Sequence, residues 1–291
     1  SRLYLEAYQI SRKPLYKRIV EETLDYVVRE MLSPNGGFYS TQDADSDGHE
    51  GTYFVWTPKE VGQVLNKVEA SAFCRFYDVT AEGNFEGANI LNIKQPLKQI
   101  AEELKMSPQQ LSEILDRGRQ QLFEERSKRI KPNRDEKILT SWNGMMAISF
   151  IEAAQVLQRT DYLEVARRNI NFILKQLCQG HQIFRTHKDG QSKIKGYLDD
   201  YANLVEALLA LYQATGGSSW LEQAILYNQE MIQQFWNVDE KGFFLTGDEH
   251  EKLVTQVRDI YDNAIPAGNS VAVFNLLKLA VLTGNKDYRQ K

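Results

Sequence analysis

The chain has 291 residues, of which 42% are hydrophobic and 25% are charged, and it contains only 7 prolines. This composition is typical of a globular protein with a substantial core, and it excludes a disordered or collagen-like chain. Lys and Arg number 35 against 39 Asp and Glu, a net charge of −4, so we expect no nucleic-acid partner.

The two cysteines, Cys74 and Cys178, lie far apart in segments of helical pattern without C-x-x-C spacing. We therefore expect free thiols in a reducing, cytoplasmic environment. No apolar stretch is long enough to span a bilayer, so no membrane partner is expected. Both ends of the chain fall inside helical patterns (LYLEAYQI and NKDYRQK), which predicts that the chain is a fragment of a longer protein.

A short signature recurs four times, each time between an apolar helical run and the start of a second one. Its copies are ISRKPLY, RTDYL, ATGGSSWL and LTGNKDY, ending or centred on Tyr16, Tyr162, Trp220 and Tyr288. Short connections of this kind predict antiparallel αα-hairpins. Aromatic segments follow some twenty residues after three of these copies, at 36–39, 180–184 and 241–244, and each predicts a short β-hairpin.

The two helices of each hairpin differ in kind. The segments 141–157, 199–214 and 268–282 are apolar on nearly all sides, as expected of helices surrounded by other helices. The segments 162–177 and 220–236 carry one apolar face and one polar face, which predicts an outer position. An inner ring of parallel helices with outer partners is an (α/α)6 toroid. The fold class predicted is thus all-α, with an incomplete toroid and short β-hairpins in the outer-to-inner loops.

The stretch from Thr57 to Arg134 departs from this pattern. It contains a helical pattern at 58–67 and a charged amphipathic one at 108–129. Its composition differs little from the rest, so the sequence predicts one toroid domain over 1–291.

Acidic, aromatic and amide residues crowd the outer-to-inner loops, which a toroid places at one end. Carboxylates beside flat rings are typical of sugar-processing sites, because one acid protonates the glycosidic oxygen while another activates water. The predicted catalytic residues are Asp199, Asp200, Asp43, Asp45 and Asp135. The predicted sugar-binding residues are Tyr39, Tyr53, Trp56, Trp142, Asn143, Tyr201, Asp262, Asn263 and Asn269.

Structural explanations remain open for several of these residues. Asp199 and Asp200 stand at a helix start, where capping would account for one of them. Asp135 could serve as a cap or pair with Lys137, and Trp142 on an inner helix could belong to the core.

Metal sites have weak sequence support. Asp43, Asp45, Asp47 and Gly48 match the start of an EF-hand loop, but Phe54 occupies the place of its final Glu, so calcium is an alternative to an Asp- and Gly-rich turn. None of the four histidines has a helical i, i+4 partner, which disfavours zinc. We expect no cofactor.

Four strings in one order, GGFYSTQDADSDGHEGTYFVWT, DEKILTSWNGMM, GYLDDYANLVEALLALY and DNAIPAGNSVAVFNLL, closely resemble one family along essentially the whole chain. This is the family of thioredoxin-domain-containing proteins that includes the spermatogenesis-associated protein and the bacterial YyaL proteins. The resemblance implies a toroid similar to six-hairpin glycosidases and N-acylglucosamine 2-epimerases. It also implies that an N-terminal thioredoxin-like domain and the last helices lie outside this chain.

Three hypotheses of function follow. The first is a carbohydrate-active domain that binds, and as an enzyme would hydrolyse, a sugar or glycoconjugate through Asp199 or Asp200 and one of Asp43, Asp45 or Asp135. The second is a non-catalytic scaffold whose partner is a peptide, the thioredoxin-like domain or a second chain completing the toroid. The third is a sugar epimerase, disfavoured because only His49 stands near a loop of the expected site.

Overall fold

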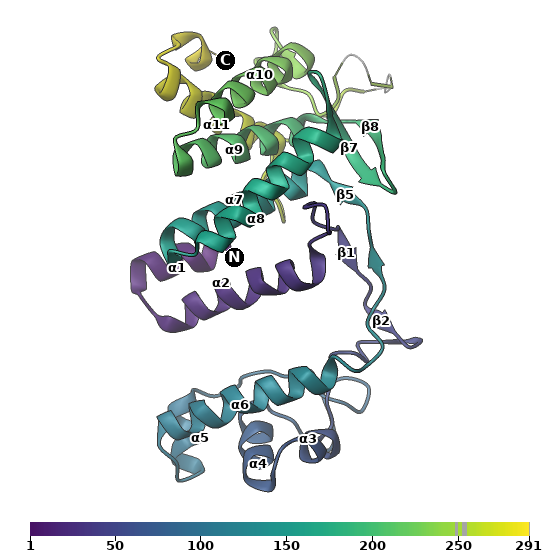
Figure 1. The fold of residues 1–291 in the computed structure, drawn as a ribbon, viewed down its shortest axis with the longest axis vertical. Helices are drawn as coiled ribbons and strands as arrows, with labels where there is room; N and C mark the ends of the chain where they lie inside the picture. The colour runs from purple at the N-terminus through teal and green to yellow at the C-terminus, as the bar shows by residue number, and fades with distance from the viewer. Residues whose placement is uncertain (248–249, 252–254, 291) are drawn as a thin grey trace. The chain divides into compact units, whose positions relative to one another are not determined.

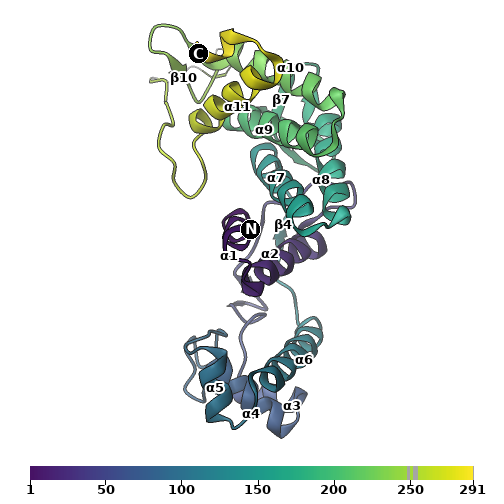
Figure 2. The ribbon, with the colours of Figure 1, turned by 90° about the vertical axis from the view of Figure 1, so that its left-hand side faces the viewer.

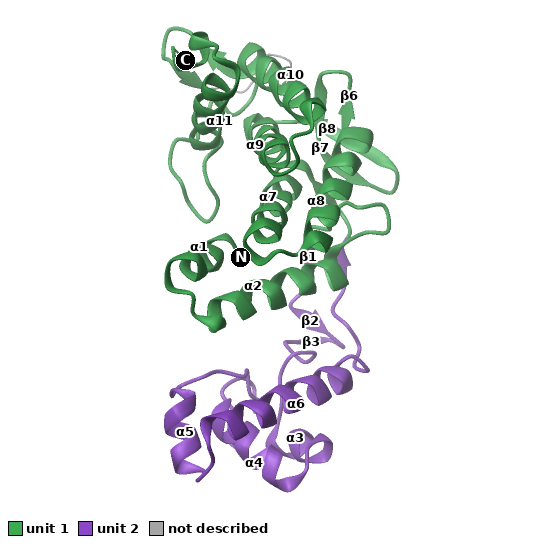
Figure 3. Ribbon diagram, turned by 60° about the vertical axis from the view of Figure 1, so that its left-hand side comes forward, with its two compact units in different colours: residues 1–40, 136–291 green, residues 41–135 purple. Residues whose placement is uncertain are grey.

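The computed structural model describes residues 1–247, 250–251 and 255–290. They form two compact units (Figure 3): unit 1 joins residues 1–40 to 136–291, and unit 2 is residues 41–135. The sequence predicts one domain over this range, whereas the structure gives unit 2 a core of its own, around residues such as Phe73 and Leu115. Each unit therefore has a hydrophobic core of its own.

Unit 1 is built from αα-hairpins. Inner helices α7, α9 and α11 follow one another across the unit, α1 packs on α7, and α8 and α10 lie behind α7 and α9 as their outer partners (Figure 2). This arrangement confirms the all-α, α/α-toroid prediction. The helices are α1 (Arg2–Ser11), α2 (Pro14–Tyr26), α7 (Thr140–Leu157), α8 (Thr160–Phe172), α9 (Leu198–Thr215), α10 (Ser218–Phe235) and α11 (Gly268–Thr283). The π-helical segments η1 (Val27–Met31) and η2 (Ile173–Leu177) follow α2 and α8, and a short 3-10 helix, η3 (Lys286–Arg289), follows α11.

All four recurring sequence signatures are tight turns that end the first helix of a pair. The residue after each first helix is left-handed, with φ of 56° at Arg12, 57° at Gln158, 71° at Gly216 and 72° at Gly284. A left-handed residue at this position redirects the chain, and its N–H donates a hydrogen bond to a carbonyl in the last turn of the helix. Glycine adopts it without strain, whereas Arg12 and Gln158 do so at a modest cost.

The strands of unit 1 lie at the opposite ends of the helices from these turns (Figure 1). The central strand β7 pairs antiparallel with β5, β6 and β8, and β9 pairs with β10. The predicted hairpins at 180–184 and 241–244 are confirmed, and the segment 36–39 forms a single bridge from Phe38 to Leu32. The bounds are β5 (Ile138–Leu139), β6 (Cys178–Gln179), β7 (Gln182–Lys188), β8 (Gln191–Lys195), β9 (Trp236–Asn237) and β10 (Gly242–Phe243).

Unit 2 contains four helices and two small antiparallel strand pairs. The predicted helices at 58–67 and 108–129 are confirmed with earlier ends, and both begin with a capping box and an early proline. The bounds are β1 (Thr41–Gln42), β2 (Asp45–Ser46), β3 (His49–Glu50), α3 (Pro58–Val64), α4 (Lys67–Phe76), α5 (Leu97–Glu103), α6 (Pro108–Arg126) and β4 (Arg134–Asp135), with β1 paired to β4 and β2 to β3.

Both cysteines are free. Cys74 lies in α4, as the helical pattern predicts, whereas Cys178 lies in strand β6, because the chain leaves η2 there to pair with β7. Within the part of the chain that the structure describes, no helix combines the length and apolarity needed to cross a membrane.

Candidate active site

Two consecutive aspartates begin α9 and are the centre of the candidate site. Tyr197 precedes the helix, and its backbone N–H donates to Asp200 Oδ2 at 3.0 Å. A carboxylate in the first turn satisfies an otherwise unpaired N–H and faces the positive end of the helix dipole. This accounts for Asp200 as a cap, but it leaves Asp199 without a capping role.

Asp200 is completely buried and accepts three hydrogen bonds. Besides Tyr197, the backbone N–H of Ser141 in α7 donates to Oδ1 at 3.0 Å, and Arg185 Nη1 of β7 donates to Oδ2 at 2.9 Å. The side chain therefore joins three elements, α7, α9 and β7. Burial, reinforced by the charge of Asp199, raises the pKa of Asp200 to about 7 against the opposing effect of Arg185 and the backbone donors.

This pKa predicts a pH dependence of stability. Between the ordinary carboxyl range and about pH 7, folded Asp200 holds a proton that the unfolded chain has released. The folded state then binds more protons than the unfolded state, so the free energy of unfolding falls as pH rises through this window. Denaturant unfolding across the window should show this decline for the wild type and a flatter curve for Asp200→Asn. Parallel curves would contradict it.

Arg185 is the residue of this site that the sequence did not identify. Its Nη1 also donates to both oxygens of Asp199, at 3.0 and 3.2 Å, and its Cζ lies 4.7 Å from the ring centroid of Tyr197. One guanidinium therefore bridges both carboxylates and stacks on an aromatic ring. The sequence places Arg185 in a hairpin, where nothing indicates that it reaches the start of α9.

Asp199 is the less buried of the two carboxylates. Its side chain is 15% exposed, against 0% for Asp200. Trp142 is 40% exposed in the first turn of α7 and directly follows Ser141, whose N–H contacts Asp200. On the other side, Gly268 at the start of α11 packs against Leu198 and the backbone of Asp199. The structure thus groups Asp199 with the starts of three inner helices.

Two amide side chains that the sequence predicts to bind sugar instead form pairs of hydrogen bonds with backbone groups. Asn143 is buried; its Oδ1 accepts from Phe38 N at 2.7 Å, and its Nδ2 donates to Phe38 O at 3.0 Å. Asn269 repeats the arrangement at the start of α11, where Oδ1 accepts from Phe243 N and Nδ2 donates to Phe243 O, both at 2.9 Å. Each amide thus hydrogen-bonds the backbone of a phenylalanine in the preceding loop to the start of an inner helix. Asn143 and Asn269 therefore have a structural role.

The other predicted binding residues of unit 1 lie in varied settings. Tyr201 is fully buried and its hydroxyl contacts Ile183 N, at 3.1 Å, and Gln234; burial raises its pKa to about 12. Tyr39 lines a cavity of about 180 Å³ with His187. Asp262 accepts from Ala267 N at 2.9 Å, and this bond keeps its pKa below the ordinary value, while Asn263 is exposed nearby in sequence.

In unit 2, Tyr53 and Trp56 are buried, with Arg126 and Arg129 stacked on their respective rings. Asp135 pairs with Thr41 across β4 and β1. These residues belong to unit 2 and Asp199 to unit 1, so their joint action stays a prediction.

The Asp-rich run of unit 2 is a two-residue hairpin. Asp47 and Gly48 connect β2 to β3 with φ of 53° and 80°, the left-handed pair of a type I′ turn. Asp43 and Asp45 are exposed beside it. Among the described residues, no three His, Cys, Asp or Glu side chains gather closely enough to hold a metal. Calcium binding here stays a prediction.

His250 also lies near the candidate site. Its ring centroid is 5.2 Å from that of Tyr197. Nδ1 lies 3.1 Å from Gly247 N and 3.3 Å from Gly247 O, and Nε2 lies 3.3 Å from Lys195 O. Both ring nitrogens therefore face backbone groups.

The sequence of this chain is similar to that of Spermatogenesis-associated protein 20 from several animals. It is 31% identical over 324 residues to human Spermatogenesis-associated protein 20, an alignment that covers 99% of this chain and 41% of the relative. Spermatogenesis-associated protein 20 is a homologue of this chain. The mouse protein is likewise 31% identical, and an uncharacterized protein of Caenorhabditis elegans is 28% identical over 306 residues, covering 94% of this chain and 42% of that protein.

The chain spans about two fifths of the length of Spermatogenesis-associated protein 20, and the alignment includes both units. No protein-family model matches the chain.

Among solved structures, D-mannose isomerase gives a TM-score of 0.49 at 12% identity, over 99% of this chain and 70% of that one. A sugar epimerase from a ruminal bacterium gives 0.45 at 11% identity, over 94% and 68%. An inactive variant of an alpha-1,6-mannanase from Salegentibacter sp. HEL1_6, in complex with alpha-1,6-mannotriose, gives 0.44 at 14% identity, over 94% and 66%.

Proposed function

We propose that this chain is a carbohydrate-active domain of the Spermatogenesis-associated protein 20 family, acting in the cytoplasm on a sugar or glycoconjugate. The observation that carries the proposal is the pair Asp199 and Asp200, two consecutive carboxylates in different environments that share Arg185. The side chain of Asp199 is 15% exposed and that of Asp200 is completely buried. Paired acids in contrasting environments are typical of acid–base sites.

In this proposal Asp199 has a different role from Asp200 and Arg185. Asp199 is the group that meets the ligand, where a carboxylate can accept hydrogen bonds from sugar hydroxyls or exchange a proton with the reacting oxygen. Asp200 and Arg185 are positioning residues, because the first is inaccessible and the second bridges the pair. Exposed Trp142 offers a flat face for a sugar ring.

Hydrolysis would require a second carboxylate about 5 to 10 Å from the first, across the scissile bond. Asp43, Asp45 and Asp135 are our candidates for it. Without that partner, the site would bind sugar without cleaving it.

A ligand screen tests the proposal. We expect one class among monosaccharides, disaccharides, uronic acids and amino sugars to raise the melting temperature, since ligand at about a hundred times its Kd adds roughly 2.7 kcal/mol to stability. Asp199→Asn should abolish this shift while leaving the unliganded protein folded, because Asp200 keeps its buried contacts. Asp239→Asn, the same change at an exposed turn, is the matched control.

A shift that survives in Asp199→Asn would remove this carboxylate from the sugar site. Absence of any shift across the panel would count against the carbohydrate proposal and favour a binding or scaffold domain. That alternative has one observation of its own: α11 exposes apolar side chains, with Phe274 61% and Val281 72% exposed. Its partner would be a thioredoxin-like domain or a second chain, which co-purification would detect.

A further inference from the structure

His187 is a histidine whose two ring nitrogens have different surroundings. It lies in β7, where the register pairs it with Ser192 of β8, so both side chains point to the same face of the hairpin. Nδ1 lies 2.9 Å from Ser192 Oγ, and that hydroxyl donates to the carbonyl oxygen of Gln176 at 2.6 Å. Because the hydroxyl proton is used there, Ser192 Oγ accepts from His187, and the ring proton lies on Nδ1.

The second ring nitrogen, Nε2, is thereby left as a hydrogen-bond acceptor. Within the described residues it has no hydrogen-bond partner, and it is not among the completely buried polar atoms that lack one. It therefore keeps some exposed surface. Burial lowers the pKa of His187 below the ordinary histidine value, so the ring is neutral at pH 7 and Nε2 keeps its lone pair.

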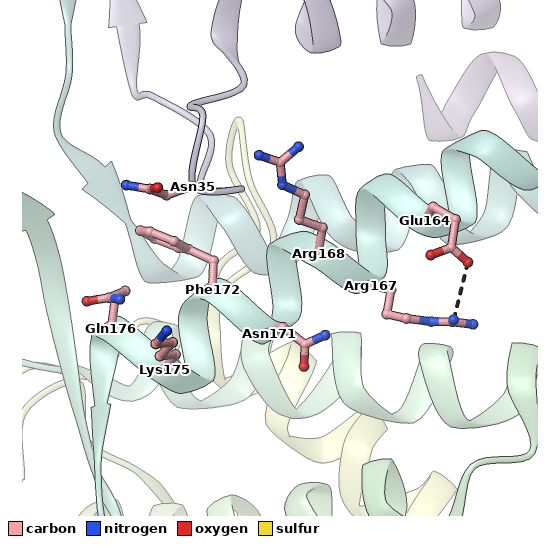
Figure 4. Close-up of a pocket in the computed structure, with 8 residues that line it drawn as sticks. All are labelled: Asn35, Glu164, Arg167, Arg168, Asn171, Phe172, Lys175 and Gln176. Atoms are coloured by element: carbon pink, nitrogen blue, oxygen red, sulfur yellow. Dashed lines mark ion pairs between the residues drawn. The ribbon is translucent and has the colours of Figure 1, made fainter.

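His187 lines the same cavity of about 180 Å³ as Tyr39. The walls come from the loop of residues 33–39, from β5 with the residue near its start, and from the turn between β7 and β8. Phe172, at the end of α8, makes an edge-to-face contact with the His187 ring, with centroids 5.4 Å apart. Phe172 and Asn35 also line the neighbouring cavity drawn in Figure 4. The imidazole is thus held by a ring contact as well as by its Nδ1.

The lining of this cavity favours a small neutral ligand with both hydrogen-bond donors and acceptors. Glu136 and Asp189 contribute carboxylates and Lys188 an ammonium group, so both signs of charge are present. Tyr39 and Phe172 add ring surface beside these polar groups. A sugar ring presents hydroxyls around its edge and C–H groups on its faces, which match such a mixture.

We propose that this cavity is a second carbohydrate subsite, in which His187 Nε2 accepts a hydrogen bond from a hydroxyl of one neutral sugar ring. This role rests on the proposed carbohydrate binding of the chain, but it uses neither Asp199 nor Arg185. Ser192 is a positioning residue, because it acts only through the tautomer of His187. We expect Kd here to be larger than at Asp199, so occupancy in the thermal-shift screen stays low.

The test is NMR of the full chain, isotopically labelled at its histidine ring nitrogens and titrated with D-glucose, D-mannose, D-galactose and N-acetyl-D-glucosamine. Without sugar, we expect the His187 ring to carry its proton on Nδ1. One of these sugars should then shift the Nε2 signal of His187 in a saturable way. A ring protonated on Nε2 in the free protein, or a signal that no sugar shifts, would overturn the proposal.

Two variants measure what the ring contributes. His187→Leu should raise the Kd of that sugar roughly three- to tenfold, as expected for the loss of one hydrogen bond. Ser192→Ala, which leaves the imidazole in place, should give a mixture of the two ring tautomers and a smaller loss of affinity. Thermal unfolding checks that each variant is folded. His181→Leu, at an exposed histidine next to the other end of β7, is the matched control. An equal loss of affinity in this control would contradict the assignment.

Asp199→Asn separates this subsite from the site at the start of α9. Shifts of His187 Nε2 that persist in Asp199→Asn would support a separate subsite. An unchanged Kd in His187→Leu, with binding lost in Asp199→Asn, would overturn the second subsite and leave the proposed function intact. Binding that depends on His187 and not on Asp199 would support the subsite and remove Asp199 from the proposed function.

Discussion

Replacing Asp200 with Ala should lower the free energy of unfolding by about 3–5 kcal/mol, because three donors lose a buried acceptor and each unsatisfied buried group costs about 1–3 kcal/mol. The loss leaves the N–H groups of Ser141 and Tyr197 and one nitrogen of Arg185 without this acceptor, at a fully buried position. Urea unfolding monitored by circular dichroism measures the change.

The neighbouring aspartate supplies the control for this experiment. Asp199→Ala removes contacts from the same Arg185 nitrogen, but at a side chain that is 15% exposed. Its cost should be about 1 kcal/mol, because water can solvate the groups left behind. Equal costs for the two variants would show that Asp200 does not hold α7, α9 and β7 together in the way the contacts indicate.

Substituting Gly144 with Ala should destabilise the protein by about 1–3 kcal/mol through overpacking. The two inner helices α7 and α9 meet here: a Cβ on Gly144 would lie 2.7 Å from the backbone oxygen of Asn203 and 2.9 Å from its carbonyl carbon. Backbone atoms inside a helix cannot move aside as a flexible side chain can, so the helices must separate. Differential scanning calorimetry gives the change.

Gly62 in α3 provides the matched glycine. A Cβ there meets no atom within 4 Å, so Gly62→Ala should stabilise the protein by about 0.5–1 kcal/mol, the ordinary gain for removing a helical glycine. If Gly144→Ala gave the same gain, the close approach of α7 to α9 would be refuted.

The helices of unit 1 could be predicted because their sequence patterns are unambiguous. α7, α9 and α11 are apolar on nearly every side, and a recurring signature marks the turns that follow them. The helical pattern around Cys74 predicts α4 without its bounds, whereas α5 is not predicted, since it is short and lies in a stretch without that recurrence. The separate core of unit 2 was also missed, because both cores are built from the same kinds of apolar residues.

The candidate site was predictable only in part. Asp199 and Asp200 stand out in sequence as two acids at a helix start, but their difference in exposure depends on how α7 and β7 pack over them. Arg185 joins them through a tertiary contact that hairpin position does not specify. The sequence predicts that Asn143 binds sugar because it accompanies acidic and aromatic residues of the outer-to-inner loops. Its hydrogen bonds with the backbone of Phe38 are a tertiary contact that this pattern does not specify.

The pairing of β1 with β4 bears on how unit 1 folds. Phe38 and Asn143 are joined by hydrogen bonds although 105 positions separate them in sequence, and closing so long a loop carries an entropic cost. Gln42 pairs with Arg134, so the strand that enters unit 2 and the strand that leaves it run together. Once β1 and β4 have paired, only the few residues between Phe38 and β1 and between β4 and Asn143 remain in the loop that the Phe38–Asn143 contact closes. We therefore expect that folding of unit 2 lowers the entropic cost of bringing the α1–α2 hairpin against α7, and so speeds the folding of unit 1.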